Sequence, residues 1–377
     1  MKMALCFAFA FVAAATCAMA QDHGNVDDAA PVPVRTSRLE FSKPETIANI
    51  GADATYLDNF RCADDGSAYI FVNGNVSGTN ADPDRQNLPP LLGVHPDSTV
   101  TSFPWWSVPQ FSWMSLPQSV FVGNGHVYVL DRGRRISKEQ ERTPVSPVVL
   151  KYDMAGHLQE TISPAEDRNA FVLGVFPSGH MLLIAEDRLN HRMSLDLLDE
   201  HGVFIRVLRL NKDDFVERAA QLPTASRGTG SYSTNSLISS SELVPWNGHL
   251  VLVPLYSSGL PIIELSEDGV VSSITPHLPE GTVIESLISV GASTVTIQPG
   301  KVLQSGNPTV DPQGKFMGVP TQPFPRITLI SRANGGIVKE LDLGSADVEP
   351  ECESAGVYQF LTSDHEGMLQ LVSARAQ

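Results

Sequence analysis

Acidic and amide side chains occur in several of the short segments that precede a glycine turn and an apolar run. These residues are Asp58, Asn59, Glu242 and Glu285, with Asn235 and Glu353 at the beginnings of similar segments. Carboxylate and amide oxygens are the ligands that Ca²⁺ takes in proteins. If the segments converge in the fold, their residue types permit a calcium site, although their spacing alone does not specify one.

A second cluster of chemically notable side chains is aromatic. It places Phe103, Trp105, Trp106, Phe111 and Trp113 within eleven residues, and it holds three of the four tryptophans. Large flat rings with one polar handle can form a platform for a sugar or an apolar ligand. Bulky rings can also fill the wedge-shaped gaps between packed sheets. Both interpretations are open, and packing between sheets is favoured.

Three histidines, His126, His180 and His249, each follow the glycine of a turn. Equivalent positions in successive repeats lie about 10 Å or more apart, whereas the ligands of one metal ion lie about 2 Å from it. The histidines are therefore predicted to be solvated turn residues. The sequence has no HExxH motif, no paired CxxC motif, no EF-hand loop and no Gly-x-Ser-x-Gly elbow. No catalytic residue is identified.

The elements that would position these residues follow an internal repeat of two modules. The first is a glycine turn followed by an apolar run, at residues 68–72, 127–130, 181–184, 250–253 and 368–372. The second is a strand, a tight turn and another strand, at residues 150–158, 195–207, 262–274 and 327–341, and more weakly at 91–103. Asp, Asn and Gly in these turns accept the positive φ that hairpin loops need.

Alternation of the two modules predicts four-stranded antiparallel sheets, which are the blades of a β-propeller. We predict an all-β fold over residues 35–377 with six blades, at about 55–105, 115–163, 169–210, 236–276, 283–343 and 353–377. Residues 37–41 are predicted to supply the outer strand that the last blade lacks. This strand would close the ring, which leaves no exposed sheet edge. An irregular fifth blade leaves five or seven blades open.

The N-terminus has the pattern of a secretory signal peptide over residues 1–20. Lys2 precedes an apolar run at residues 4–15, and Ala-Met-Ala at residues 18–20 is a cleavage pattern. We predict cleavage after residue 20, an acidic disordered tail over residues 21–34, and a periplasmic or secreted protein. No apolar stretch reaches the roughly 20 residues that a membrane span needs.

Only Cys62 and Cys352 remain after such cleavage. Each lies early in its predicted blade, and the first and last blades are neighbours in a closed ring. An oxidising compartment would allow the two thiols to pair. Because a bridge needs Cα atoms within about 7 Å, the alternatives are a disulfide that joins the ends of the ring and two buried thiols.

Part of the third repeat resembles an NHL repeat. Residues 182–192 read LLIAEDRLNHR, and the turn that follows at residues 200–202 is Glu-His-Gly. Residues 127–136 match the pattern in part. Families with NHL repeats form six-bladed propellers of the TolB-like superfamily. The resemblance therefore implies a six-bladed propeller. It covers two blades well and the others only in outline.

In NHL propellers the Asp and Arg of the motif lie in the turn after the second strand. Ion pairs and backbone hydrogen bonds there hold the blades together. The resemblance therefore implies a structural role for Asp131, Arg132, Asp187, Arg188 and Arg192, and a ligand role is the alternative.

Three further segments interrupt the repeat, and loops on a rigid scaffold are where binding usually occurs. They cover residues 73–90, 212–222 and 298–325. The second begins with Asp213 and Asp214 and is predicted to form one short helix.

The net charge of −16 repels nucleic acid phosphates and disfavours an anionic lipid surface. We therefore predict no nucleic-acid partner. The pattern favours a monomeric, exported binding or scaffold module for an unidentified protein or carbohydrate ligand, and it identifies no cofactor. The alternative is a metal-dependent hydrolase, lactonase or lyase with its site at the mouth of the channel. Calcium-dependent propeller enzymes of that kind draw their ligands from the innermost strands.

Overall fold

The computed structural model describes residues 34–49, 54–63, 65–74, 91–105, 108–114, 117–136, 145–164, 168–187, 192–210, 241–256, 259–302, 309–310, 316–318, 321–344, 350–363 and 368–377. The chain divides into two compact units, Met1–Pro33 and Val34–Gln377, and all of these residues belong to the second. Every regular element within them is a β-strand. In the same residues no helix is long and apolar enough to cross a membrane. The predicted all-β class is confirmed.

The predicted signal peptide over residues 1–20 and nearly all of the tail over residues 21–34 lie outside the described residues. The helix predicted at residues 212–222 also lies outside them.

Four of the sheets contain four or five strands each. The first has the order β3 (Ala54–Cys62), β4 (Ala68–Gly74), β5 (Leu91–Val94), β6 (Val100–Phe103). The second contains β7 (Phe111–Met114), β8 (Ser119–Gly123), β9 (His126–Arg135), β10 (Val145–Asp153) and β11 (Leu158–Ile162). The third has the order β12 (Arg168–Val175), β13 (Met181–Asp187), β14 (Arg192–Leu198), β15 (Phe204–Val207). The fourth has the order β16 (Glu242–Trp246), β17 (His249–Val253), β18 (Ile262–Ser266), β19 (Gly269–Ile274).

A fifth sheet is larger and contains ten strands. Its path is β20 (Thr282–Val290), β21 (Thr294–Val302), β25 (Arg326–Ser331), β26 (Ile337–Asp342), β1 (Arg35–Phe41), β29 (Met368–Ala376), β28 (Val357–Ser363), β27 (Pro350–Ser354). Off this path, β2 (Glu45–Asn49) pairs with β29, and β24 (Thr321–Pro323) pairs with β21. The short strands β22 (Thr309–Val310) and β23 (Phe316–Gly318) form a separate pair.

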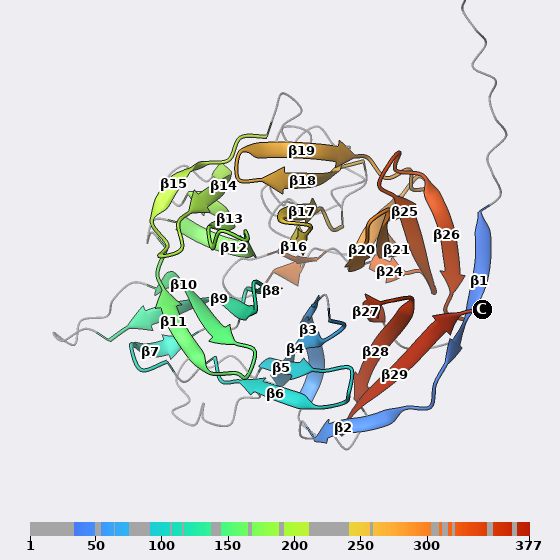
Figure 1. Ribbon diagram of the computed structural model, residues 1–377, viewed down its shortest axis with the longest axis horizontal. Helices are drawn as coiled ribbons and strands as arrows, with labels where there is room; N and C mark the ends of the chain where they lie inside the picture. Colours follow the sequence, from blue (N-terminus) through green and yellow to red (C-terminus); the bar gives the residue numbers. More distant parts are fainter. Residues whose placement is uncertain are drawn as a thin grey trace, which may run out of the picture. The chain divides into compact units, whose positions relative to one another are not determined.

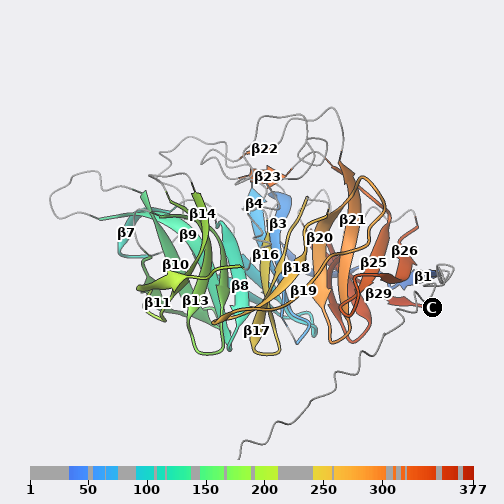
Figure 2. The same cartoon turned by 90° about the horizontal axis from the view of Figure 1, so that it is seen from above.

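The inner strands of these sheets contact one another in a closed cycle. Going round the cycle, β3 contacts β8, then β12, β16, β20 and β27 follow, and β27 contacts β3. Figure 1 shows these strands around a common centre, with the later strands of each sheet outside them. Viewed at a right angle, β8, β16 and β20 stand side by side (Figure 2). The sheets of the second unit are therefore arranged as a β-propeller.

The residue ranges of the sheets follow the predicted repeat closely, and the differences are local. The second sheet begins earlier than predicted, because β7 adds a strand beside the far end of β9. The predicted excursion at 298–325 is partly sheet, because β21 continues to Val302 and β24 pairs with it. The strand β9 continues to Arg135, so Asp131 and Arg132 lie within a strand and not in the turn that the NHL resemblance implies.

Two N-terminal strands, and not the single predicted one, join the end of the chain. Residues 35–38 of β1 pair with β26 in parallel, and residues 39–41 pair with β29 in the antiparallel sense. The strand β2 pairs with the other half of β29. Leu39 is buried, and it packs in a cluster that includes Ile327 and Phe360 from both sides of β1. The predicted strand at 37–41 thus exists, but it bridges two groups of strands.

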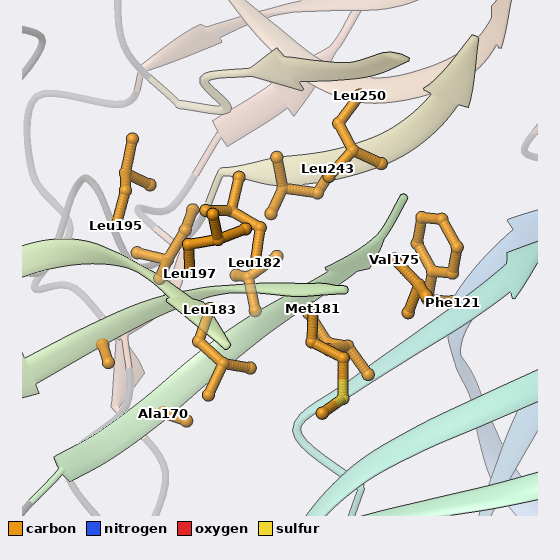
Figure 3. Close-up of a cluster of buried hydrophobic side chains, with 14 of the residues drawn as sticks. Phe121, Ala170, Val175, Met181, Leu182, Leu183, Leu195, Leu197, Leu243 and Leu250 are labelled. Atoms are coloured by element: carbon orange, nitrogen blue, oxygen red, sulfur yellow. The ribbon is translucent and has the colours of Figure 1, made fainter. Parts of the chain in front are cut away.

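The cores between neighbouring sheets are apolar and continuous. Leu182 and Leu183 of β13 belong to a buried cluster that also contains Phe121 of β8 and Leu243 of β16 (Figure 3). The first five residues of β13 are all buried. A strand with both faces covered by neighbouring sheets has a continuous apolar sequence, which explains the unbroken run at residues 181–184.

Candidate functional site

A cavity of about 220 Å³ lies among four of the six inner strands. Residues of β3, β16, β20 and β27 line it, together with the turn that follows β27. On β3 and β20 the lining residues belong to the C-terminal part of the strand. Its charged side chains are those of Arg61, Glu242, Glu351 and Glu353. The strand order of the fold therefore brings together charged residues that lie far apart in the sequence.

Arg61 and Glu242 form an ion pair at this cavity. Arg61 Nη1 donates to Glu242 Oε1 at 3.0 Å, and the two side chains are only 13% and 16% exposed. In the cycle of inner strands, β3 and β16 are not adjacent in either direction. Figure 1 shows the two strands on opposite sides of the common centre. The pair therefore crosses the centre of the sheets.

Glu353 forms the wall of the cavity on β27. Its Oε2 accepts a hydrogen bond from Ser289 Oγ of β20 at 2.7 Å, and its Oε1 accepts one from the backbone N–H of Gly356 at 2.8 Å. Burial, together with the negative charge of Glu353, raises the pKa of Tyr358 to about 12. The Tyr358 phenol thus stays protonated at neutral pH, and the Glu353 carboxylate is held in one orientation by two donors.

The disulfide between Cys62 and Cys352 lies beside the cavity. Their Cα atoms are 5.4 Å apart, which is within the range that a bridge needs. Cys62 lines the cavity, and Cys352 is fully buried. Of the two alternatives for these cysteines, the disulfide is confirmed.

The predicted calcium ligands do not all meet at this cavity. Glu242 and Glu353 line it, whereas Glu285 packs against Gly300 of β21, where a Cβ on Gly300 would come within 2.6 Å of Glu285 Oε2. Asp58 and Asn59 lie on β3, but their side chains are outside the described residues, as is all of Asn235. Within the described ranges, no group of three or more His, Cys, Asp and Glu side chains could hold a metal ion.

Of the aromatic cluster, Trp105 is placed clearly. Its side chain is fully buried, and its ring packs edge-on against Phe71 of β4 with centroids 5.5 Å apart. Trp105 also shares a buried cluster with Met114 and Val120 of the second sheet. It therefore fills the space between two sheets. Trp106 and the side chain of Trp113 are outside the described residues.

The charged residues of the NHL-like motif make contacts within and between sheets. Asp131 is fully buried, and its Oδ1 accepts a hydrogen bond from the backbone N–H of Arg132. The Arg132 guanidinium lies 6.0 Å from the ring centre of Phe171 in the next sheet. Asp187 pairs with Arg168 across β12 and β13 at 3.6 Å. Arg188 and the side chain of Arg192 lie outside the described residues.

Two of the turn histidines are paired with carboxylates and are not simply solvated. His180 Nδ1 lies 2.7 Å from Glu267, and His249 Nδ1 lies 2.6 Å from Glu264. His126 Nδ1 lies 2.8 Å from the backbone oxygen of Asn124. Each histidine has different partners, so the three do not form one site.

Sequence reasoning did not select Arg61 or Ser289 as site residues. Arg61 adjoins Cys62, and that adjacency to a cysteine near the ring closure is the only signal that could have found it. Ser289 lies in an apolar strand with no distinguishing neighbour. Their contacts with Glu242 and Glu353 join residues that are 181 and 64 positions apart in the sequence.

Comparison with known proteins assigns no family. No known protein family matches the sequence. No curated protein matches it either.

Among solved structures, a glucose dehydrogenase is 14% identical over 88% of this chain and 99% of its own, with a TM-score of 0.39. A second glucose dehydrogenase is 9% identical over 89% and 100%, with a TM-score of 0.40. A family 117 glycoside hydrolase of Zobellia galactanivorans is 8% identical over 90% of each chain, with a TM-score of 0.36. Likeness at this level does not extend to activity or substrate.

Proposed function

We propose that this protein is an exported β-propeller that binds a small polar ligand in the cavity between its inner strands β3, β16, β20 and β27. The observation that carries the proposal is the convergence of Arg61, Glu242 and Glu353 from three different sheet regions on one cavity. Its volume of about 220 Å³ is below the roughly 300–1,000 Å³ of most ligand pockets, so the ligand is small.

The proposed ring has six blades. The ten-stranded sheet counts as two of them, because its strands β20, β21, β25 and β26 and its strands β27 to β29 are joined only through β1. The cycle of contacts among β3, β8, β12, β16, β20 and β27 supports one inner strand for each blade. Proposed NHL-like and TolB-like kinship rests on the motif at residues 182–192 and its partial copy at 127–136. The buried Asp131 and the Arg132 contact with Phe171 fit a structural role for the partial copy.

Export to the periplasm or outside the cell remains part of the proposal. It rests on the signal-peptide pattern over residues 1–20 and is supported by the Cys62–Cys352 disulfide, because disulfides persist in oxidising compartments. We also propose that the protein is a monomer.

A binding role is favoured over the metal-dependent hydrolase, lactonase or lyase. Arg61 places a permanent positive charge at the cavity. Its guanidinium is paired with the Glu242 carboxylate, which would otherwise be available to bind a cation. A nearby guanidinium repels Ca²⁺ and competes for its ligand. Because Trp105 is buried between sheets, the aromatic cluster gives a carbohydrate ligand no support from that residue.

The test is a thermal-shift screen of the oxidised protein. The panel comprises free amino acids, monosaccharides, short carboxylates, amines and CaCl2, because a ligand of the native state raises Tm by mass action. We expect at least one small organic compound to raise the Tm of the wild type. It should not raise the Tm of Val244→Phe, in which a ring fills the cavity.

The matched control is Val338→Phe, which adds the same ring at a position that is 51% exposed on β26. This variant should respond to the ligand as the wild type does. The proposal is wrong if no compound shifts the wild type, or if Val244→Phe and Val338→Phe respond equally. A shift with CaCl2 alone, reversed by EDTA, would favour the metal-dependent enzyme.

A further inference from the structure

Two of the charged residues at the cavity, Arg61 and Glu242, form an ion pair that spans it. Arg61 and Glu242 approach from strands that are not neighbours, and their side chains are 13% and 16% exposed. Ion pairs on the surface contribute little because water screens them, whereas a largely buried pair is costly to separate. A ligand that enters between β3 and β16 separates Arg61 from Glu242. It must therefore supply an opposite charge to each of the two residues.

This requirement restricts the charge of the ligand. An anion that took Arg61 would set Glu242 apart from its guanidinium, and a cation that took Glu242 would do the same to Arg61. Removing one partner of a largely buried ion pair is strongly unfavourable. A ligand with one carboxylate and one ammonium group supplies a partner to both residues at once.

The other lining residues favour the same class of ligand. One arginine and three glutamates line the cavity, so its negative excess favours the ammonium group of a ligand over a second carboxylate. Val244, Leu287 and Val290 supply apolar wall, which suits an aliphatic side chain. The volume of about 220 Å³ limits that side chain to a few carbon atoms.

We infer that the cavity binds a small aliphatic α-amino acid as its zwitterion. The carboxylate of the amino acid pairs with the Arg61 guanidinium, and its ammonium group pairs with the Glu242 carboxylate. Glu353, held by Ser289 and Gly356, adds negative charge on the β27 wall. This inference rests on the proposed function and names its ligand class.

The experiment compares L-valine with two analogues that each lack one charge. Isobutylamine keeps the ammonium group and the side chain, and 3-methylbutanoate keeps the carboxylate and the side chain. Isothermal titration calorimetry should give L-valine a Kd lower than that of either analogue by about tenfold or more. Equal affinities for L-valine and one analogue would overturn the inference, because a single charge would then suffice.

The double variant Arg61→Gln/Glu242→Gln removes both charges together and keeps the size of both side chains, so neither residue is left facing the other's charge. We expect it to lose the preference for L-valine over the analogues. Val338→Ala, on the exposed face of β26, should retain that preference. Unchanged preference in the folded double variant would contradict the inference, and if that variant does not fold, the comparison on the wild type still decides.

The screen separates this inference from the proposed function. If another small compound stabilises the wild type but not Val244→Phe while L-valine and its relatives do not bind, the amino-acid inference fails and the binding function stands. If no compound binds, both fail.

Discussion

Glu264 is a single carboxylate that joins three elements. It lies on β18, and it accepts hydrogen bonds from His249 on β17 at 2.6 Å and from Ser272 on β19 at 3.0 Å. Arg332, from the turn after β25, reaches it at 2.8 Å and also stacks 4.7 Å from the ring centre of Trp246. Glu264 therefore links the fourth sheet to its neighbour. Burial raises the pKa of Glu264, but the bonds from His249 and Ser272 and the charge of Arg332 outweigh it, and the pKa falls below 4.5.

The lowered pKa predicts a pH dependence for Glu264→Gln. A carboxyl group whose pKa is lower in the folded state stabilises the protein above the pKa of the unfolded state, and it loses that contribution as the pH falls through the folded pKa. At neutral pH we expect the variant to lose about 2 kcal/mol of unfolding free energy, because the negative charge that strengthens the hydrogen bonds of Glu264 is lost. Below pH 4.5 the difference from the wild type should shrink.

Urea unfolding measured from neutral to acid pH tests this prediction. Glu280→Gln, at an exposed position before β20, is the control and should match the wild type throughout. A difference between Glu264→Gln and the wild type that stays constant with pH would contradict the linkage.

At the scale of elements, two hairpin glycines allow the backbone of a neighbouring segment to approach closely. Gly156 and Gly335 both have positive φ, at 85° and 75°. A Cβ on Gly156 would lie 2.3 Å from the backbone oxygen of Ser102, and one on Gly335 would lie 2.1 Å from that of Thr275. In both cases the contacted backbone belongs to the preceding sheet or to the chain directly after it. The glycines are therefore required by close packing as well as by turn geometry.

Gly248 provides a matched comparison for Gly335→Ala. Its φ is 83°, but a Cβ there would have nothing within 4 Å. Gly248→Ala should therefore cost only the strain of positive φ, about 1 kcal/mol. Gly335→Ala should cost about 2 kcal/mol more, because a backbone must also move. Chemical denaturation measures both, and equal losses would show that packing between the sheets does not depend on this glycine.

At the scale of the whole second unit, the last strands of the chain are fixed on both sides. The disulfide joins β27 to β3, and β1 joins β29 to β26. The cysteines are separated by 290 residues in the sequence. A cross-link over so long a loop removes much of the conformational entropy of the unfolded chain. The closure of the ring thus depends on covalent and hydrogen-bonded contacts together.

The double variant Cys62→Ala/Cys352→Ala is predicted to lose about 4 kcal/mol of unfolding free energy. Urea unfolding with and without reductant measures this loss. The wild type in reductant should approach the variant, and the variant itself should not respond to reductant. If the wild type unfolds at the same urea concentration in both conditions, the disulfide does not stabilise the ring.

Much of the sheet architecture could be predicted because short-range sequence patterns indicate strands and hairpins. Turns with Gly156 and Gly335 and apolar runs such as residues 181–184 each report a strand or a hairpin locally. The cysteines were found for the same reason, since only Cys62 and Cys352 remain outside the first twenty residues. The strand β2 was missed because residues 45–49 carry no such pattern, and their pairing is determined by β29.

The amino-acid sequence by itself determined the all-β class, the strand-and-turn repeat and the approximate limits of the sheets. Only the tertiary structure decided that β1 bridges two groups of strands, that Trp105 is buried, and that Arg61 meets Glu242. Alternation along a strand indicates which face a side chain occupies, but not which distant strand lies opposite. Arg61 and Glu242 are 181 residues apart, so their contact arises only when the inner strands close around a common centre.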